Sequence, residues 1–209
     1  MKKIYFVLPI IATFLVFMGV ETQMNFATEE LSPSNTGKTS EEKALPLSGT
    51  KKILVAYYSR TGNTREIASQ IHKSVGGDIF EIQTVEPYPE DYEEVKKKAA
   101  QEQESGYKPA LKAKIKNLKS YDLVFIGYPI WWGTIPPPVK TFLSEYDFSG
   151  KTIVPFCTHG GSGLGQSVTD ISKLCPKSTL LDGIAVWGRD AKTAQNEVSE
   201  WLRKIKITK

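Results

Sequence analysis

The chain of 209 residues is predicted to fold into one open, doubly wound α/β domain, in which a parallel sheet of five strands carries helices on both faces. From Lys51 onward, short apolar runs alternate with stretches of helical periodicity, as strands and crossover helices do in parallel sheets. The composition, with 40% hydrophobic and 24% charged residues, is that of an ordinary globular protein. Two cysteines are too few for a disulfide scaffold or a four-cysteine zinc site, so a packed core must stabilise the fold. No Cys-x-x-Cys or His-Glu-x-x-His spacing occurs, and no metal is implied.

The five strands are expected where short apolar runs are rich in β-branched and aromatic residues. In chain order these runs are residues 53–58, 79–84, 123–128, 152–157 and 180–187. Cys157 falls inside the fourth run, whereas Cys175 follows the next helical stretch. The two thiols should therefore lie too far apart for a disulfide, and we expect both to be free and buried.

Six helices are expected between and after these strands, because apolar residues recur there at intervals of three and four. The sixth should be capped by Asp190. The marker residues are Ile67, Ile71 and Val75; Tyr92, Val95 and Ala99; Leu111, Ile115 and Leu118; Val139, Phe142 and Tyr146; Leu164, Val168, Ile171 and Leu174; and Ala194, Val198, Trp201 and Ile205.

The N-terminal residues 1–27 are predicted to be an export signal or a membrane anchor. Two lysines precede an uncharged, mostly apolar run of 17 residues at positions 4–20, which is the order found in export signals. As a helix the run would be ~26 Å long, slightly short of a bilayer core, so its length does not choose between a cleaved signal and a tether. Either alternative places the protein outside the cytoplasm.

Residues 28–50 are predicted to be a disordered linker. They are rich in Ser, Thr, Glu, Lys and Pro and offer too few apolar side chains to offset the entropy of ordering. Gly37, Lys38 and Thr39 imitate the end of a nucleotide-binding P-loop, but no strand precedes them and Ser32 stands where that motif needs glycine. The folded domain is therefore expected at residues 51–209.

The functional site is expected at the carboxyl ends of the strands, where open α/β sheets bind ligands. The loop after the first strand combines hydroxyls, an amide, a glycine and the free N–H groups of a helix start, which together can surround a phosphate. A structural alternative is a capped helix start with glycine in a tight turn. The candidate residues are Ser59, Arg60, Thr61, Gly62, Asn63 and Thr64.

Two further loops complete the expected site. The loop after the third strand carries adjacent tryptophans that can stack on a flat ligand, although one of them should pack inward. Glycines in the loop after the fourth strand let backbone N–H groups approach a ligand, beside a histidine that could instead be a packing residue. The candidate residues are Pro129, Trp131, Trp132, Gly133 and Thr134 in the former loop, and Thr158, His159, Gly160, Gly161 and Ser162 in the latter.

Together the three loops resemble those of the flavodoxin-like family of FMN-binding proteins, over residues 51–209. In that family a Ser/Thr-x-Thr-Gly-x-Thr loop holds the FMN phosphate, and Arg60 occupies a variable position of this pattern. Trp131 or Trp132 matches the aromatic that lies against the isoalloxazine ring, and residues 158–162 match the loop at its pyrimidine edge. The resemblance implies FMN as cofactor and the strand order 2-1-3-4-5. It is nearest to the exported flavodoxin-like branch.

The resemblance leaves three functions open. The protein could carry electrons to a redox partner protein or a small acceptor, could be an FMN-dependent NAD(P)H:quinone-type oxidoreductase, or could be a non-redox binding module. Residues 51–209 carry 23 Lys and Arg against 18 Asp and Glu, unlike the acidic electron-carrier flavodoxins. This balance is too mild to indicate nucleic acid. The third loop also lacks the acidic residue and the tyrosine with which many flavodoxins cover the outer face of the ring, and the sequence leaves the oligomeric state open.

Overall fold

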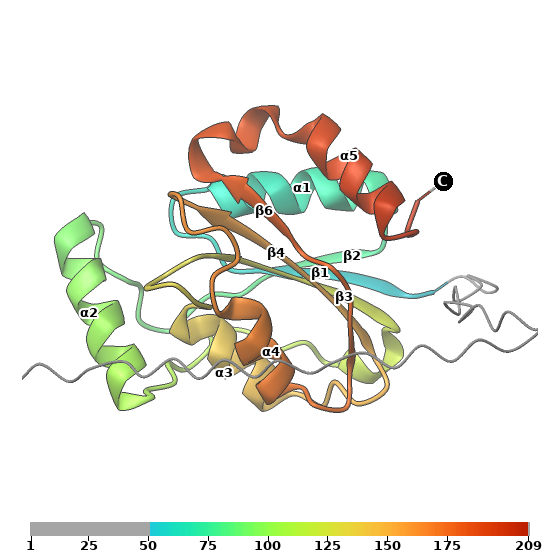
Figure 1. Cartoon of the computed structure of the whole chain (residues 1–209). Helices are drawn as coiled ribbons and strands as arrows, with labels where there is room; N and C mark the ends of the chain where they lie inside the picture. The colour runs from blue at the N-terminus through green and yellow to red at the C-terminus, as the bar shows by residue number, and fades with distance from the viewer. Residues whose placement is uncertain (1–50, 209) are drawn as a thin grey trace, which may run out of the picture. The chain divides into compact units, whose positions relative to one another are not determined.

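A computed structural model describes residues 51–208 of the chain (Figure 1). The predicted signal or anchor at residues 1–27 and the predicted linker at 28–50 lie outside the described residues. Within 51–208, no helix is long and apolar enough to cross a membrane.

The sheet is parallel throughout and its strand order is β2-β1-β3-β4-β5, with β6 also paired to β4. This confirms the doubly wound class and the order implied by the family resemblance. The strands are β1 (Ile53–Tyr57), β2 (Asp78–Glu81), β3 (Leu123–Pro129), β4 (Thr152–His159), β5 (Thr179–Leu180) and β6 (Ile184–Trp187).

The predicted fifth strand, residues 180–187, is two strands, because one extra residue interrupts its pairing with β4. Ile153 pairs with Leu180 and Phe156 pairs with Ile184, so three steps along β4 face four steps on its partner. The mismatch lies opposite Pro155, which has no N–H to donate to the ladder. At Gly183, a Cβ atom would lie 2.9 Å from the Pro155 carbonyl oxygen, so the bulge also needs glycine.

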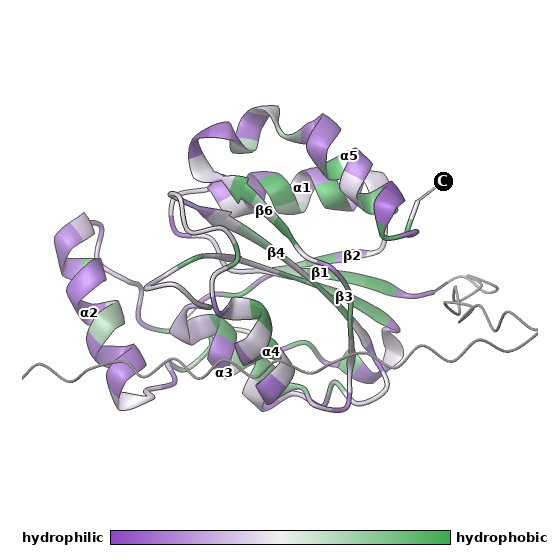
Figure 2. Ribbon diagram, in the orientation of Figure 1, coloured by the Kyte–Doolittle hydropathy of each residue, from purple (hydrophilic) through white to green (hydrophobic). Residues whose placement is uncertain are grey.

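Helices α1 (Asn63–Val75) and α5 (Gln195–Lys204) cover one face of the sheet, and α3 (Pro137–Glu145) and α4 (Ser167–Leu174) cover the other (Figure 1). Successive residues of the strands point to opposite faces, which divides the core into two clusters. The apolar sides of the helices face the sheet (Figure 2). Helix α2 (Tyr92–Ser105) stands apart from these layers, beyond the carboxyl ends of the strands.

The prediction of a helix at residues 111–118 is wrong. Thr84, predicted to end the second strand, instead forms an isolated antiparallel bridge with Leu111, and β2 already ends at Glu81. The N–H of Ile115 donates to the Tyr146 hydroxyl at 2.8 Å. Because tertiary partners take up these backbone groups, only a 3-10 turn, η1 (Leu118–Ser120), forms.

The prediction that Asp190 caps the last helix is also wrong. Asp190 lies within the 3-10 segment η2 (Gly188–Thr193), and α5 begins after Ala194 without a side-chain cap. The carbonyl of Ala191, which is buried, accepts a hydrogen bond of 2.8 Å from the Gln70 amide on α1. This contact with α1 fixes the turn in place of a cap. The two cysteines are free and buried, as predicted.

Candidate functional site

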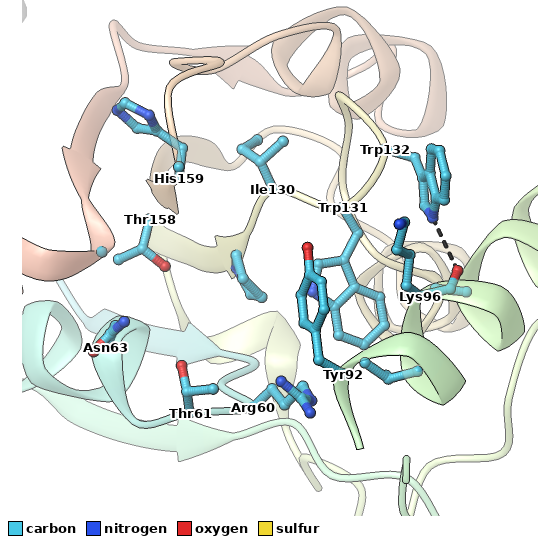
Figure 3. A pocket seen from close by; sticks show the side chains of 15 residues that line it. Arg60, Thr61, Asn63, Tyr92, Lys96, Ile130, Trp131, Trp132, Thr158 and His159 are labelled. Carbon is cyan, nitrogen blue, oxygen red and sulfur yellow. Dashed lines mark hydrogen bonds between the residues drawn. The ribbon is translucent and has the colours of Figure 1, made fainter. Parts of the chain in front are cut away.

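A pocket of about 440 Å³ opens at the carboxyl ends of β1, β3 and β4, with α2 as its outer wall (Figure 3). Nine of the sixteen predicted site residues line it, from all three expected loops. They are Arg60, Thr61, Asn63, Pro129, Trp131, Trp132, Thr158, His159 and Gly160. The structure therefore brings together loops that are nearly 100 residues apart in the chain.

The first loop presents unpaired donors at the start of α1. Gly62 has φ 91° and so turns the chain into the helix, while the Ser59 hydroxyl accepts the N–H of Arg65 at 3.2 Å. Among the described residues, the N–H groups of Thr61, Asn63 and Thr64 have no protein acceptor. Free N–H groups at a helix start attract an anion.

Arg60 adds a buried donor to the same loop. One of its Nη atoms donates to the carbonyl of Glu90, but its Nε is buried and has no hydrogen-bond partner within residues 51–208. A buried guanidinium nitrogen without an acceptor is costly. A phosphate group in the adjoining pocket would remove that cost.

Thr61 and Thr64 occupy different positions although both belong to the phosphate-loop pattern. Thr61 is exposed and lines the pocket, whereas Thr64 is 1% exposed and its hydroxyl bonds that of Thr158 at 2.8 Å. Thr158 in turn lines the pocket. Thr64 thus supports the wall of the site from behind and joins the first loop to the third.

The tryptophans stand on a tight turn closed by two hydrogen bonds between Trp131 and Thr134, of 3.0 and 3.1 Å. The two central residues, Trp132 and Gly133, have φ values of 49° and 78°. Positive φ at both central positions is the geometry of a type I′ turn, which a bulky residue rarely adopts. The turn holds both indoles at the pocket.

As expected, one tryptophan packs inward and the other is exposed. Trp131 packs edge-on against Tyr88 and Tyr58, with ring centroids 4.9 and 5.5 Å away. Trp132 is 57% exposed, and its indole N–H donates to the carbonyl of Lys96 on α2 at 3.1 Å (Figure 3). One ring is therefore anchored in the aromatic cluster, and the other stands at the mouth of the pocket.

In the third loop, His159 and Gly160 line the pocket but Gly161 and Ser162 do not. The His159 Nδ1 accepts the N–H of Gly161 at 2.9 Å, and its ring lies 5.1 Å from that of Trp187. His159 therefore has a packing role at the rim.

The remaining predicted residues stand behind the pocket. Ser59, Gly62 and Gly133 shape the two turns, and the Thr134 hydroxyl donates to Asp170 on α4.

Sequence reasoning missed the contribution of α2. Tyr92, Val95, Lys96 and Ala99 share one helix face and line the pocket, with Tyr92 in front of Trp131 (Figure 3). Their spacing predicts a common face, but not that this face meets a ligand site. Ile130 and Gly188 were missed as well.

The lining is electrostatically positive. It contains two cations, Arg60 and Lys96, and the described lining residues include no carboxylate. Lys96 also forms an ion pair of 3.2 Å with Glu93 on the exposed side of α2. Such a pocket favours an anionic ligand.

An open α/β sheet with an anion-binding loop and an aromatic turn at its carboxyl edge defines a nucleotide-type cofactor protein. Comparison with known proteins narrows this class. Residues 52–205 match the family model described as Flavodoxin, and the chain belongs to that family.

Solved structures agree with this membership. A protein of Bacteroides eggerthii assigned as a flavoprotein is 37% identical, with a TM-score of 0.66, over 74% of this chain and 98% of its own. A second such protein, from Bacteroides uniformis, is 32% identical and has the same TM-score. The match covers 73% of this chain and 98% of that protein. A flavoprotein of Lactobacillus acidophilus, solved in complex with FMN, is 25% identical, with a TM-score of 0.56, over 68% and 97%.

FMN is accordingly the cofactor of this fold, and the residues present suit it. The N–H groups at the start of α1 and the unpartnered Arg60 Nε fit a phosphate. Trp131, Trp132 and Tyr92 supply the aromatic surface that a flat ring requires.

Proposed function

We propose that this protein transfers electrons through bound FMN and works outside the cytoplasmic membrane. One observation carries the redox part: the anion-binding loop and the aromatic turn share a pocket whose mouth is open beside the exposed Trp132. When bound, FMN would supply the electron-accepting and electron-donating chemistry.

The chain's own residues then bind and orient the cofactor. Thr61, Asn63 and Arg60 would hold the phosphate end, and Thr158, whose hydroxyl bonds that of Thr64, lines the same pocket. Trp131 gives the ring a rigid surface because the tyrosine cluster behind it fixes its position. The open mouth leaves an edge of the ring accessible to a redox partner protein or a small acceptor.

A second candidate is an FMN-dependent NAD(P)H:quinone-type oxidoreductase. The cation Lys96 at the pocket, beside Tyr92 and Trp132, supports it, because these groups suit a second planar anionic ligand. Only this candidate needs a nicotinamide to reach the ring face.

Anaerobic stopped-flow mixing of the FMN-loaded protein with NADH or NADPH separates the two candidates. A carrier keeps its yellow colour for minutes, whereas the oxidoreductase bleaches within seconds and recovers its colour when a quinone is added. Rapid bleaching would replace our first proposal with the second. Failure to retain FMN at all would reject both.

The proposed location rests on the apolar run at residues 4–20. Fractionation of cells that express the full chain is expected to recover it in the membrane or outside the cell. A variant carrying Leu8→Arg and Leu15→Arg should stay in the cytosol, because two charges interrupt the run. Recovery of the parent chain in the cytosol would refute export.

A further inference from the structure

The amino ends of the strands, at the edge of the sheet opposite the pocket, carry an excess of positive charge. The ends of α1, α3, α4 and α5 meet the starts of the strands there, on the side away from α2 (Figure 1). We call this surface the basic edge. Two of its cations are already bound: Lys151, at the start of β4, is buried and donates to the carbonyls of Lys119 and Tyr121, and Lys114 pairs with Glu145. The other nine are Lys51, Lys52, Lys73, Lys116, Lys119, Lys177, Arg203, Lys204 and Lys206.

Contacts across the surface confirm that residues distant in sequence meet at this edge. Lys52 Nζ lies 3.2 Å from the Ser120 hydroxyl, and the N–H of Gly150 donates to the carbonyl of Lys177 at 2.9 Å. Ile205 and Ile207, which flank Lys206, pack on the same core cluster as Ile53 and Val75. These contacts place the segments around Lys52, Ser120, Lys177 and Lys206 at one edge of the domain.

The charge imbalance concentrates here. Four carboxylates, Asp78, Asp122, Glu145 and Asp147, accompany the nine cations together with Lys114 and Lys151, so the edge has a formal excess of seven positive charges. Residues 51–208 contain 22 Lys and Arg and 18 Asp and Glu, which leaves 11 cations and 14 carboxylates for the rest of the described domain. The net positive charge of the domain thus lies entirely at the end opposite the pocket.

Each of the four carboxylates already accepts a hydrogen bond or forms an ion pair, whereas the nine cations form no ion pair among the described residues. Asp78 accepts the Tyr121 hydroxyl, Asp122 accepts the N–H of Lys52, and Asp147 accepts the N–H of Ser149. Glu145 pairs with Lys114 at 3.4 Å, outside the nine. Among the described residues, none of the nine cations is in an ion pair. The edge therefore presents unpaired charge to an external anion.

The position of Lys51 suggests which anionic surface this is. The domain begins at this edge, and the apolar run at residues 4–20 precedes it in the chain. A membrane tether would thus keep the basic edge within reach of the lipid surface, although the predicted linker at residues 28–50 does not by itself orient the domain. We propose that the basic edge docks on an anionic lipid surface and directs the FMN pocket away from the membrane. The proposal rests on the proposed location, and ~1 kcal/mol per cation near such a surface makes docking favourable.

The test uses the full chain reconstituted into phosphatidylcholine vesicles, with and without phosphatidylglycerol. Energy transfer to acceptor-labelled lipid headgroups is measured from a donor on Lys204→Cys, at the basic edge, or on Lys192→Cys, near the pocket end of α5. Both native cysteines are buried, so each label stays on the introduced thiol. Phosphatidylglycerol should raise transfer roughly twofold at position 204 but not at 192, and about 0.5 M salt should abolish the rise.

A matched pair of triple variants tests the assignment of the surface. Lys119→Gln, Lys177→Gln and Lys206→Gln should weaken docking by roughly a hundredfold in phosphatidylglycerol titrations. Lys97→Gln, Lys108→Gln and Lys112→Gln remove the same charge elsewhere and should have little effect. An equal loss in both variants would overturn the proposal.

Energy transfer at position 204 that is the same with and without phosphatidylglycerol would also overturn the proposal. That result would favour an acidic protein as the partner of this edge. Flotation with neutral vesicles reports the tether separately, and flavin absorbance reports the cofactor, so failure of the proposed function is seen independently. A chain recovered without its N-terminal segment is tested by flotation with the same anionic vesicles, and lack of binding would likewise overturn the proposal.

Discussion

Single residues of the first loop have separable roles at this site. Thr61 faces the pocket, while Thr64 is buried and holds Thr158 in the wall. A hydroxyl that faces a charged phosphate contributes to cofactor affinity, whereas a buried hydroxyl pair contributes mainly to stability. The two threonines should therefore respond differently to substitution.

Thr61→Ala is expected to weaken FMN binding by roughly 10- to 150-fold, because a hydrogen bond to a charged group contributes ~1.5–3 kcal/mol. Titration followed by flavin fluorescence measures it. Thr169→Ala, on the exposed side of α4, is the matched control and should bind FMN like the parent. If Thr61→Ala also binds like the parent, Thr61 does not contact the phosphate.

Thr64→Val should lower the free energy of unfolding by ~1–3 kcal/mol, because it leaves the buried Thr158 hydroxyl without its partner. Thr64→Ser keeps the hydroxyl and should retain most of the stability. Urea unfolding without FMN compares the two variants. Equal stability of Thr64→Val and the parent would contradict a structural role for the pair.

At the scale of elements, the second and third loops support each other through two glycines. The N–H of Gln166 donates to the carbonyl of Gly133 at 2.8 Å. A Cβ atom on Gly165, where φ is +53°, would lie 2.2 Å from that same oxygen. The aromatic turn and the third loop can approach this closely only because Gly165 has no side chain.

Gly165→Ala should therefore lower the free energy of unfolding by more than the conformational cost of placing alanine at a positive φ. Gly106→Ala is the control, because Gly106 has φ +68° and no atom near its built Cβ, so only the conformational cost of ~1–2 kcal/mol applies. We expect Gly165→Ala to exceed it by at least ~1 kcal/mol in urea unfolding, since the turn must move. Equal costs would show that the loops separate freely.

Helix α2 is held at the site by hydrogen bonds that it exchanges with the aromatic turn. Trp132 donates to the carbonyl of Lys96, and the Gln103 amide donates to the carbonyl of Trp131 at 3.0 Å. Only Val95, Ala99 and Glu102 of this helix are buried. With so little apolar burial, these bonds should account for much of its attachment.

Trp132→Phe should increase amide hydrogen exchange of α2 by roughly two- to tenfold, because the lost bond contributes ~0.5–1.5 kcal/mol. Trp201→Phe removes an equivalent indole bond, to the carbonyl of Asp182, and should leave α2 unchanged. Exchange followed by mass spectrometry compares the variants. Unchanged exchange of α2 in Trp132→Phe would show that packing alone holds the helix.

At the scale of the whole molecule, burial of the thiols couples stability to alkaline pH. Burial raises the pKa of Cys157 to about 12 and that of Cys175 to about 11. An unfolded cysteine has a pKa of ~8.5. Their contribution is complete below that value and is lost as the pH rises toward the folded pKa, because the unfolded chain releases protons that the folded chain retains.

The free energy of unfolding should therefore fall between about pH 8.5 and 11, by up to ~1.4 kcal/mol per pH unit for each thiol. Urea midpoints across this interval measure the slope. Cys175→Ala should show a shallower decline than the parent, even if it is less stable at pH 7. Parallel declines would mean that other groups govern the alkaline response.

The sequence by itself determined the class of fold and the composition of the loops. Strand and helix periods are local, and they placed the first four parallel strands to within three residues and all but one of the expected helices. The loop at 59–64 and the two tryptophans were identified because turn and anion-binding chemistry needs few, adjacent residues. The carboxyl edge of a parallel sheet then places such loops together.

Tertiary structure alone decided which of these residues reach the pocket. Thr61 and Thr64 look equivalent in the sequence, and only the contact with Thr158, across 94 positions, separates them. Tyr92 and Lys96 became pocket residues because the Trp132 bond sets α2 against the site. Residues 111–118 form no helix because Leu111 pairs with Thr84. The predicted last strand is two strands because its pairing with β4 is interrupted opposite Pro155. Each outcome depends on partners distant in the chain, which periodicity along one segment does not encode.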